Sequence, residues 1–109
     1  LEDLSPAGIE AWRAGMALLA QRPNVVAKLS GLGTFLHRND PAHIGFVVGE
    51  TVRLFGAGRC LFGSNFPIEK LWTRYDALVD AYRAATQTLS AADRQAIFHD
   101  TAAGIYRLA

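Results

Sequence analysis

Two short apolar runs in this sequence end in polar side chains that could carry chemistry. Residues 60–67 are CLFGSNFP, so one run ends in Gly-Ser-Asn with a proline close behind. Residues 25–30 are VVAKLS, in which Lys28 and Ser30 fall on one face of an expected strand. A lysine in this position could bind a substrate carboxylate or oxyanion, and the amide of Asn65 could hydrogen-bond a ligand. The alternatives are a lysine that extends to the strand's end and an ordinary turn at Asn65.

Two further residues in loops complete the candidate site. His37 lies in the loop that follows the first run, and Glu69 stands four residues after Asn65 in the loop that follows the second. In parallel sheets and barrels, reactive groups gather where the strands reach their carboxyl ends. The sequence therefore predicts that Lys28, His37 and Asn65 converge at one end of the two strands, with Glu69 within reach. A plain loop residue remains the alternative for His37.

The elements that must position these residues alternate along the chain. Expected strands span residues 25–30 and 60–64, and Ser5-Pro6 and Asp40-Pro41 each predict the start of a helix. Thr73 is expected to cap a third helix. Ser90 is expected to begin a last one, whose buried stripe would include Ile97, Phe98, Ala102, Ile105 and Tyr106. Strands that alternate with helices of this length predict an α/β fold with neighbouring parallel strands, joined by the helix that starts at Pro41.

Two strands are too few for a stable parallel sheet, which needs both faces and both edges covered. The sequence is therefore interpreted as the last part of a larger α/β protein, or as a unit that must associate. We expect exposed strand edges or apolar helix faces unless a partner covers them.

Composition narrows the function classes. Half of the 109 residues are hydrophobic, 19% are charged and the formal net charge is +1, which gives no reason to expect nucleic acid or a membrane as partner. The single cysteine, Cys60, is expected to be a buried apolar residue and favours a reducing, cytoplasmic location. The three histidines have no metal-ligand spacing, so no metal ligand is assigned.

Three separated segments resemble one family. NVVAKLSGL (24–32), RCLFGSNFPIEK (59–70) and IFHDTAAGIYRL (97–108) are similar to the final segments of the amidohydrolase-2 branch of the amidohydrolase superfamily. The resemblance implies the last two β/α units of a TIM (β/α)8 barrel plus C-terminal helices. Residues 1–109 would then be the C-terminal portion of a single amidohydrolase-like barrel domain, with residues 25–30 as its seventh strand and residues 60–64 as its eighth.

The resemblance also implies roles for the candidate residues. The family's last strand usually ends in Gly-Ser-Asp, whose aspartate is a metal ligand or the base that activates water, and here the matching residue is Asn65. An amide takes no proton at neutral pH, so Glu69 is the nearest carboxylate that could replace the aspartate. The cofactor stays open: a divalent metal such as zinc is one expectation for the complete barrel, with ligands mostly outside these residues.

The sequence thus supports two hypotheses. The first is part of a TIM-barrel hydrolase in which water attacks a cyclic ester (a lactone) or a related carbonyl of a small molecule. Lys28, Ser30 and His37 would bind the substrate, and Asn65 and Glu69 would act in catalysis. The second is an inactive truncated half-barrel unit that only associates with a partner, either the remainder of a barrel or another copy.

Overall fold

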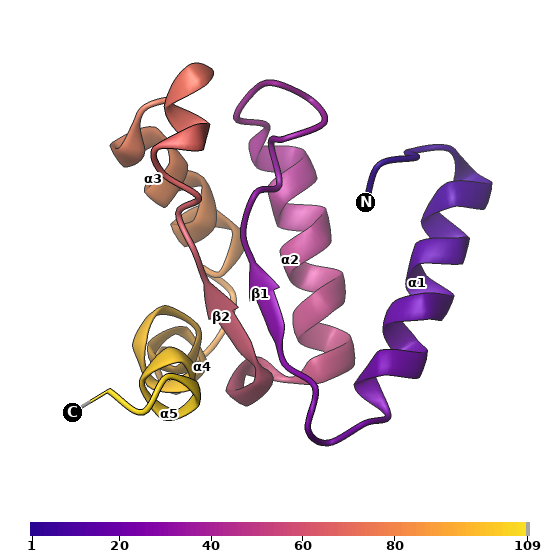
Figure 1. The fold of residues 1–109 in the computed structure, drawn as a ribbon, viewed down its shortest axis with the longest axis vertical. Helices are drawn as coiled ribbons and strands as arrows, with labels where there is room; N and C mark the ends of the chain where they lie inside the picture. Colours follow the sequence, from indigo (N-terminus) through magenta and orange to yellow (C-terminus); the bar gives the residue numbers. More distant parts are fainter. Residues whose placement is uncertain (109) are drawn as a thin grey trace.

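Two short strands lie side by side at the centre of the molecule, with helices around them (Figure 1). The structure is a computed structural model, and it describes residues 1–108. In chain order the helices and strands are α1 (Pro6–Ala20), β1 (Ala27–Leu29), α2 (Pro41–Phe55), β2 (Cys60–Phe62), α3 (Tyr75–Ala85), α4 (Ala91–Gln95) and α5 (Thr101–Ile105). Two 3-10 turns, η1 (Ala57–Arg59) and η2 (Ile68–Leu71), flank β2, and a π-helical turn, η3 (Ala96–Asp100), joins α4 to α5.

The two strands pair in parallel and are joined through α2, which confirms the prediction from the β-α-β order. Ala27 stands opposite Cys60 and Leu29 opposite Phe62, and the Gly63 amide extends the ladder by donating to the Leu29 carbonyl at 3.0 Å. Both strands are shorter than the predicted ranges 25–30 and 60–64. The register explains the shorter first strand, because residues 25 and 26 would face positions 58 and 59, which belong to the 3-10 turn η1.

One face of the strand pair packs on the main hydrophobic core; the other face carries Lys28 and, opposite it, the buried Leu61. Leu29 and Cys60 are almost fully buried and belong to the hydrophobic core between the strands and the helices. The other members of this core are Ile44, Val48, Phe55, Ala57, Leu78, Ala81, Tyr82 and Ile97. Since side chains alternate along a strand, Lys28 lies on the opposite face, and it is exposed. The apolar neighbours of Lys28 in the sequence predict a buried lysine, and this prediction is wrong.

Helix starts follow the sequence at three of four predicted positions. The side chains of Ser5, Asp40 and Ser90 accept hydrogen bonds from the backbone amides of Gly8, His43 and Asp93, as expected of N-caps. Thr73 is not the cap of α3, because the helix begins one residue later, with Arg74 at the N-cap position. The Thr73 amide instead donates to the Glu69 carbonyl and closes the turn at η2.

The last helix buries only the first part of the expected stripe: Ile97 is buried, and Phe98 and Ala102 are half-buried. The π turn at Ala96–Asp100 interrupts it, and Thr101 is buried where it donates from Oγ1 to the Ala57 carbonyl at 3.2 Å. Ile105 and Tyr106 are about half exposed. A π turn accommodates an extra residue relative to regular α spacing, so it shifts which later residues face the core.

Apolar surface remains uncovered on several elements. No residue of α1 is fully buried, and Leu18 and Leu19 are 66% and 50% exposed. Within residues 1–108 the sheet has only two strands, so each strand has one unpaired edge. These features agree with the expectation that the unit lacks part of its packing. No helix in the described part of the chain is both long and apolar enough to cross a membrane.

Candidate active site at the carboxyl ends of the strands

The segment after β2 turns sharply at Asn65. Its backbone φ is 56°, in the left-handed region, where asparagine is among the few non-glycine residues that occur readily. The Phe66–Pro67 peptide bond that follows is cis, and η2 begins at Ile68. This turn brings Glu69 back towards the end of the strand, because the Glu69 amide donates to the Asn65 carbonyl at 3.1 Å.

The carboxylate of Glu69 is the best-defined polar group at this end of the sheet. Glu69 is only 1% exposed, yet its two oxygens each accept a hydrogen bond. Asn65 Nδ2 donates to Oε1 at 3.3 Å, and the Trp72 indole donates to Oε2. Among the ion pairs of residues 1–108 none involves Glu69, so two neutral donors hold a buried carboxylate. Burial, with a smaller contribution from the negative charge of Glu69, raises the pKa of the Tyr82 phenol.

The loop after β1 contacts this carboxylate through Gly33. Gly33 is buried, and a β-carbon at this position would lie 2.7 Å from the Arg38 carbonyl oxygen, 2.8 Å from Trp72 Nε1 and 3.1 Å from Glu69 Oε2. Only glycine fits there without displacing one of these groups. The glycine therefore lets the two loops pack closely at the carboxyl ends of the strands.

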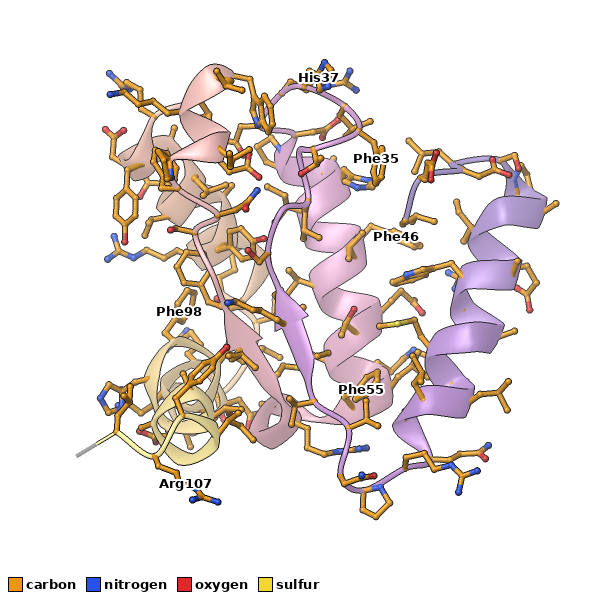
Figure 2. All side chains as sticks on the ribbon, in the orientation of Figure 1. Phe35, His37, Phe46, Phe55, Phe98 and Arg107 are labelled. Carbon is orange, nitrogen blue, oxygen red and sulfur yellow. The ribbon has the colours of Figure 1, made fainter. Side chains whose placement is uncertain are left out.

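His37 joins the group through the aromatic ring of Trp72. The His37 and Trp72 rings stack with centroids 5.5 Å apart and planes 18° apart, and His37 is exposed. Figure 2 shows His37 at the tip of the loop above β1, at the same end of the molecule as η2. The side chain thus borders the space at the strand ends, and its contact with the group is the stacked ring rather than a hydrogen bond to Asn65 or Glu69.

Lys28 and Ser30 approach the site from the neighbouring strand, beside Gly63. A β-carbon at Gly63 would lie 2.7 Å from Lys28 Cε and 3.0 Å from Ser30 Oγ, so both side chains pack against the second strand where Gly63 has no side chain. Lys28 Nζ lies 5.9 Å from the centroid of the Tyr106 ring. No carboxylate in the part of the chain described lies within ion-pair distance of Lys28.

The structure therefore brings the predicted residues together in two groups. Asn65, Glu69 and Trp72 are hydrogen-bonded, with His37 stacked on the indole, while Lys28 and Ser30 meet at Gly63, two residues before Asn65. Sequence reasoning missed Trp72. Trp72 follows Glu69 by three residues, and residues i and i+3 lie on the same side of a 3-10 turn. This spacing would have predicted the contact only if the 3-10 turn had been predicted first.

The donor set at the strand ends does not make a zinc site. Zinc is bound in proteins by histidine nitrogen, cysteine sulfur and carboxylate oxygen, usually from at least three side chains. Residues 1–108 contain no group of three or more such side chains placed to hold a metal ion. Glu69 is occupied by its two donors, and Asn65 offers only a neutral amide oxygen. The residues described here therefore do not fit a zinc ion by themselves.

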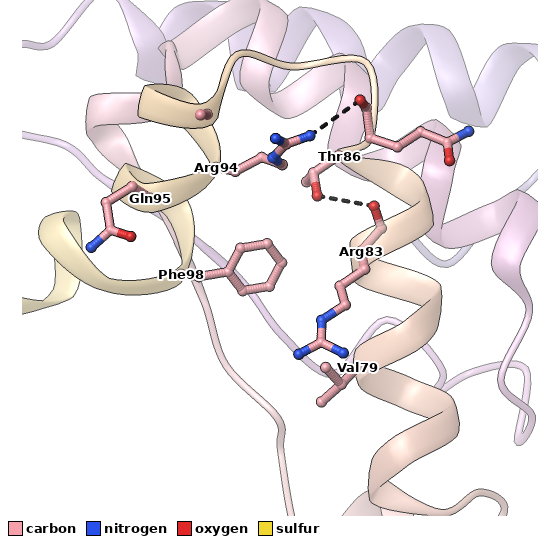
Figure 3. Close-up of a pocket in the computed structure, with 8 residues that line it drawn as sticks. Val79, Arg83, Thr86, Arg94, Gln95 and Phe98 are labelled. Carbon is pink, nitrogen blue, oxygen red and sulfur yellow. Dashed lines mark hydrogen bonds between the residues drawn. The ribbon is translucent and has the colours of Figure 1, made fainter.

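A separate hollow of about 590 Å³ lies between α3 and the α4–η3 segment. Figure 3 shows the Phe98 ring between the side chains of Arg83 and Arg94. Arg94 donates to the Gln87 carbonyl at 3.3 Å, and the Thr86 hydroxyl is bonded to backbone carbonyls of its own helix. None of the predicted site residues lines this hollow.

Comparisons with known proteins identify the family to which this chain belongs. The family model described as amidohydrolase matches residues 3–108, so the chain belongs to the amidohydrolase family. Its backbone is similar to that of two crystal structures of an amidohydrolase from Burkholderia multivorans. One was solved with bound HEPES and has a TM-score of 0.89; the other was solved with bound zinc and has a TM-score of 0.88. Both are 33% identical and match 98% and 97% of this chain but only 40% of theirs.

Sequence relatives give the same assignment. An L-fucono-1,5-lactonase from Burkholderia multivorans is 37% identical over 97% of this chain and 38% of its own length. The uncharacterized protein y4mH from Sinorhizobium fredii is 43% identical over 94% of this chain and 35% of its own. The chain thus spans well under half the length of the relatives it matches. The structural similarity and the parallel strand pair confirm the predicted α/β fold: the last two β/α units of a TIM barrel, followed by C-terminal helices.

Proposed function

We propose that these residues supply part of the catalytic face of a hydrolase that opens a lactone by water attack. The observation that carries the proposal is the position of the polar groups. The chain belongs to a family of hydrolases. The polar side chains lie towards the carboxyl ends of two adjacent parallel strands, where barrel enzymes place their chemistry; they are Lys28, Ser30, Asn65 and Glu69. The similarity to L-fucono-1,5-lactonases supports a sugar lactone as the substrate class.

The reaction is hydrolysis of a cyclic ester. The oxygen of a water molecule bonds to the lactone carbonyl carbon, and the bond from that carbon to the ring oxygen breaks. One proton of the water moves to the departing ring oxygen, and the product is an open-chain hydroxy acid. Such a reaction needs an oriented water, a proton acceptor and stabilisation of the negative charge that develops on the carbonyl oxygen.

We assign roles in this reaction to the chain's own side chains. The Lys28 ammonium, which has no carboxylate partner in residues 1–108, would stabilise the developing oxyanion, with Ser30 beside it. His37, exposed on the Trp72 ring, would border the substrate. Asn65 would hydrogen-bond the water or the substrate. The role of Glu69 as the base stays a prediction. Glu69 is buried and both of its oxygens accept hydrogen bonds, so the pH profile of Glu69→Gln tests this role.

In this proposal residues 1–109 are the C-terminal portion of a single barrel domain, completed by the remainder of the barrel. We expect a small-molecule substrate, and a divalent metal such as zinc in the complete barrel would be held mainly by residues outside this chain. The alternative is an inactive half-barrel unit that associates with a partner. The uncovered apolar surface of α1 and the two unpaired strand edges favour that alternative.

The test uses the protein as its gene encodes it. Acid release from L-fucono-1,5-lactone would be followed with a pH indicator at low buffer concentration, against the spontaneous rate. We expect acceleration that grows in proportion to enzyme concentration. No acceleration with this lactone or with other five- and six-membered sugar lactones, before and after zinc addition, would contradict the proposal. Inactivity together with a mass in solution that is a multiple of the chain mass would support the associating unit.

A further inference from the structure

Glu69 and Asn65 form a pair in which the buried carboxylate requires a hydrogen-bond donor at position 65. Glu69 is 1% exposed, and its carboxylate can only accept hydrogen bonds when ionised. The side chain opposite it at position 65 must therefore present a donor, which the Asn65 amide does at 3.3 Å. An aspartate at position 65 would place a second carboxylate at that distance, and two such carboxylates cannot both ionise without strong repulsion.

The same contact orients the two ends of the Asn65 amide. Nδ2 donates one of its two protons to Glu69 and lies against Gly31, where a β-carbon would stand 3.4 Å away. Oδ1 accepts no hydrogen bond from the described residues. An amide oxygen is an acceptor only, so the group it meets must donate a hydrogen bond.

We propose that Glu69 is a positioning residue that acts through Asn65, and that Asn65 Oδ1 accepts a hydrogen bond from a hydroxyl group of the substrate or from the attacking water. The assignment deepens the proposed function and rests on it for the identity of the ligand. The pairing of Asn65 with Glu69 does not depend on the reaction. In this view the buried carboxylate explains why an amide stands at the end of the second strand.

The geometry also explains how Glu69 is held while it orients Asn65. Its second oxygen accepts from the Trp72 indole, and Gly33 leaves room for both groups. A carboxylate with two donors and no exposure has little access to a water that it could deprotonate. The charged or titratable groups that face the pair are Tyr82 of α3, which senses the Glu69 charge, and His37, which stacks on Trp72.

The first experiment measures folding and needs no substrate. Asn65→Asp should oppose two carboxylates. We compare it with Asn65→Asp/Glu69→Gln, in which the amide introduced at position 69 can donate to the new carboxylate while its oxygen accepts from Trp72. Asn24→Asp is the matched control, because it adds the same charge at an exposed position in a loop. Urea unfolding of the protein as its gene encodes it would be followed at pH 4 and pH 8.

The expected pH dependence follows from the sign of the shift. Repulsion raises the pKa of one carboxyl in folded Asn65→Asp, so stability is retained at low pH and lost as the pH rises through that raised pKa. At pH 8 the ratio of folded to unfolded protein should fall by at least about tenfold, which corresponds to a pKa shift of one unit. The double variant should recover most of this loss, and Asn24→Asp should show none. Equal stability of Asn65→Asp and the parent protein at both pH values would overturn the pairing.

The indole proton of Trp72 gives a second measure of the same contact. Its NMR resonance should lie downfield in the parent protein and move upfield in Glu69→Ala, while the resonance of Trp12 on α1 stays in place. An unchanged Trp72 resonance in Glu69→Ala would also count against the pair.

The last experiment tests whether Glu69 acts through Asn65, with L-fucono-1,5-lactone as the probe. Asn65→Gly removes the side chain and suits the left-handed backbone. Glu69→Gln should lower kcat/KM by about 100-fold, typical of a displaced contact group, without changing the shape of the pH profile. In an Asn65→Gly background it should cost no further activity. A further loss there, or a pH profile without its acidic limb in Glu69→Gln, would make Glu69 the base.

The same kinetics distinguish the two donors that Asn65 could meet. A raised KM with unchanged kcat in Asn65→Gly would indicate a substrate hydroxyl, and a lowered kcat with unchanged KM would indicate the attacking water. Full activity in Asn65→Gly would overturn the ligand assignment. A protein that fails on every lactone but shows the predicted stabilities would refute the proposed function and leave the pair intact.

Discussion

Removing the charge of Lys28 should separate activity from stability. Lys28 is exposed, lacks a carboxylate partner within residues 1–108, and has the Tyr106 ring 5.9 Å from its ammonium nitrogen. A cation near an aromatic ring at an exposed site contributes about 0.5–1 kcal/mol at most. Lys28→Met keeps the apolar stem and removes only the charge. We therefore expect the free energy of unfolding to fall by no more than about 1 kcal/mol.

The effect on activity should be larger. A hydrogen bond from an ammonium group to a negatively charged oxygen contributes about 1.5–3 kcal/mol, which corresponds to about a 10- to 150-fold loss of kcat/KM when it is removed. Because Gly63 has no side chain, the Lys28 stem can pack over the second strand. In the proposed function its charge would stabilise the oxyanion. Lys28→Arg should retain part of the rate, because it keeps the charge.

The assay compares Lys28→Met with Lys70→Met, which removes the same charge from the exposed turn η2. Lactone hydrolysis and urea unfolding would be measured on the same preparations. Activity of Lys28→Met within twofold of the parent, or a loss that merely follows the fraction of unfolded protein, would refute the reasoning. Lys70→Met should change neither quantity appreciably.

Two further predictions concern the scaffold. The Arg59 guanidinium donates to the carbonyls of Ala20, Arg22, Val25 and Phe55 at 2.7–3.2 Å. Arg59→Ala should therefore lower the free energy of unfolding by about 2–4 kcal/mol in urea titrations, against under about 0.5 kcal/mol for exposed Arg83→Ala; equal effects would contradict this. Burial raises the pKa of the Cys60 thiol to about 11 from 9.0. The contribution of the neutral thiol to the free energy of unfolding is therefore fully present below about pH 9 and is lost as the pH rises through 11. An aromatic disulfide reagent at pH 8 should label Cys60 only after unfolding; rapid native labelling would disprove its burial.

Local signals in the sequence predicted the features that depend on neighbouring residues. Asp40 and Ser90 cap helices where their side chains reach an amide three residues on, and this contact needs no information from elsewhere in the chain. The β-α-β order likewise predicted the parallel pair, because few connections of that length are compatible with another arrangement. The exact strand ends could not be predicted, since they depend on where η1 begins on the partner strand.

The sequence indicates which residues are candidates for the site, but it does not indicate the contacts that they make. Lys28, Asn65 and Glu69 stand out because polar side chains follow apolar runs. The burial of Glu69 depends on a 3-10 turn, on Gly33 from another loop and on Trp72, none of which has a periodic signature. The exposure of Lys28 depends on what covers the outer face of the strand pair, and the composition of the strand itself contains no information about that.

Lys28 and Glu69 differ in burial and in hydrogen bonding, and this difference suggests different roles for them in the proposed site. Lys28 carries a charge with no carboxylate partner in residues 1–108 and so can meet a negative group from outside. Glu69 carries a charge that is buried and satisfied by two internal donors, so its electrostatic effect goes into orienting them. A buried polar group held this way stabilises one arrangement of its neighbours, because every alternative leaves a carboxylate oxygen without a donor. The first charge is suited to a reacting group, and the second to holding Asn65 in place for it.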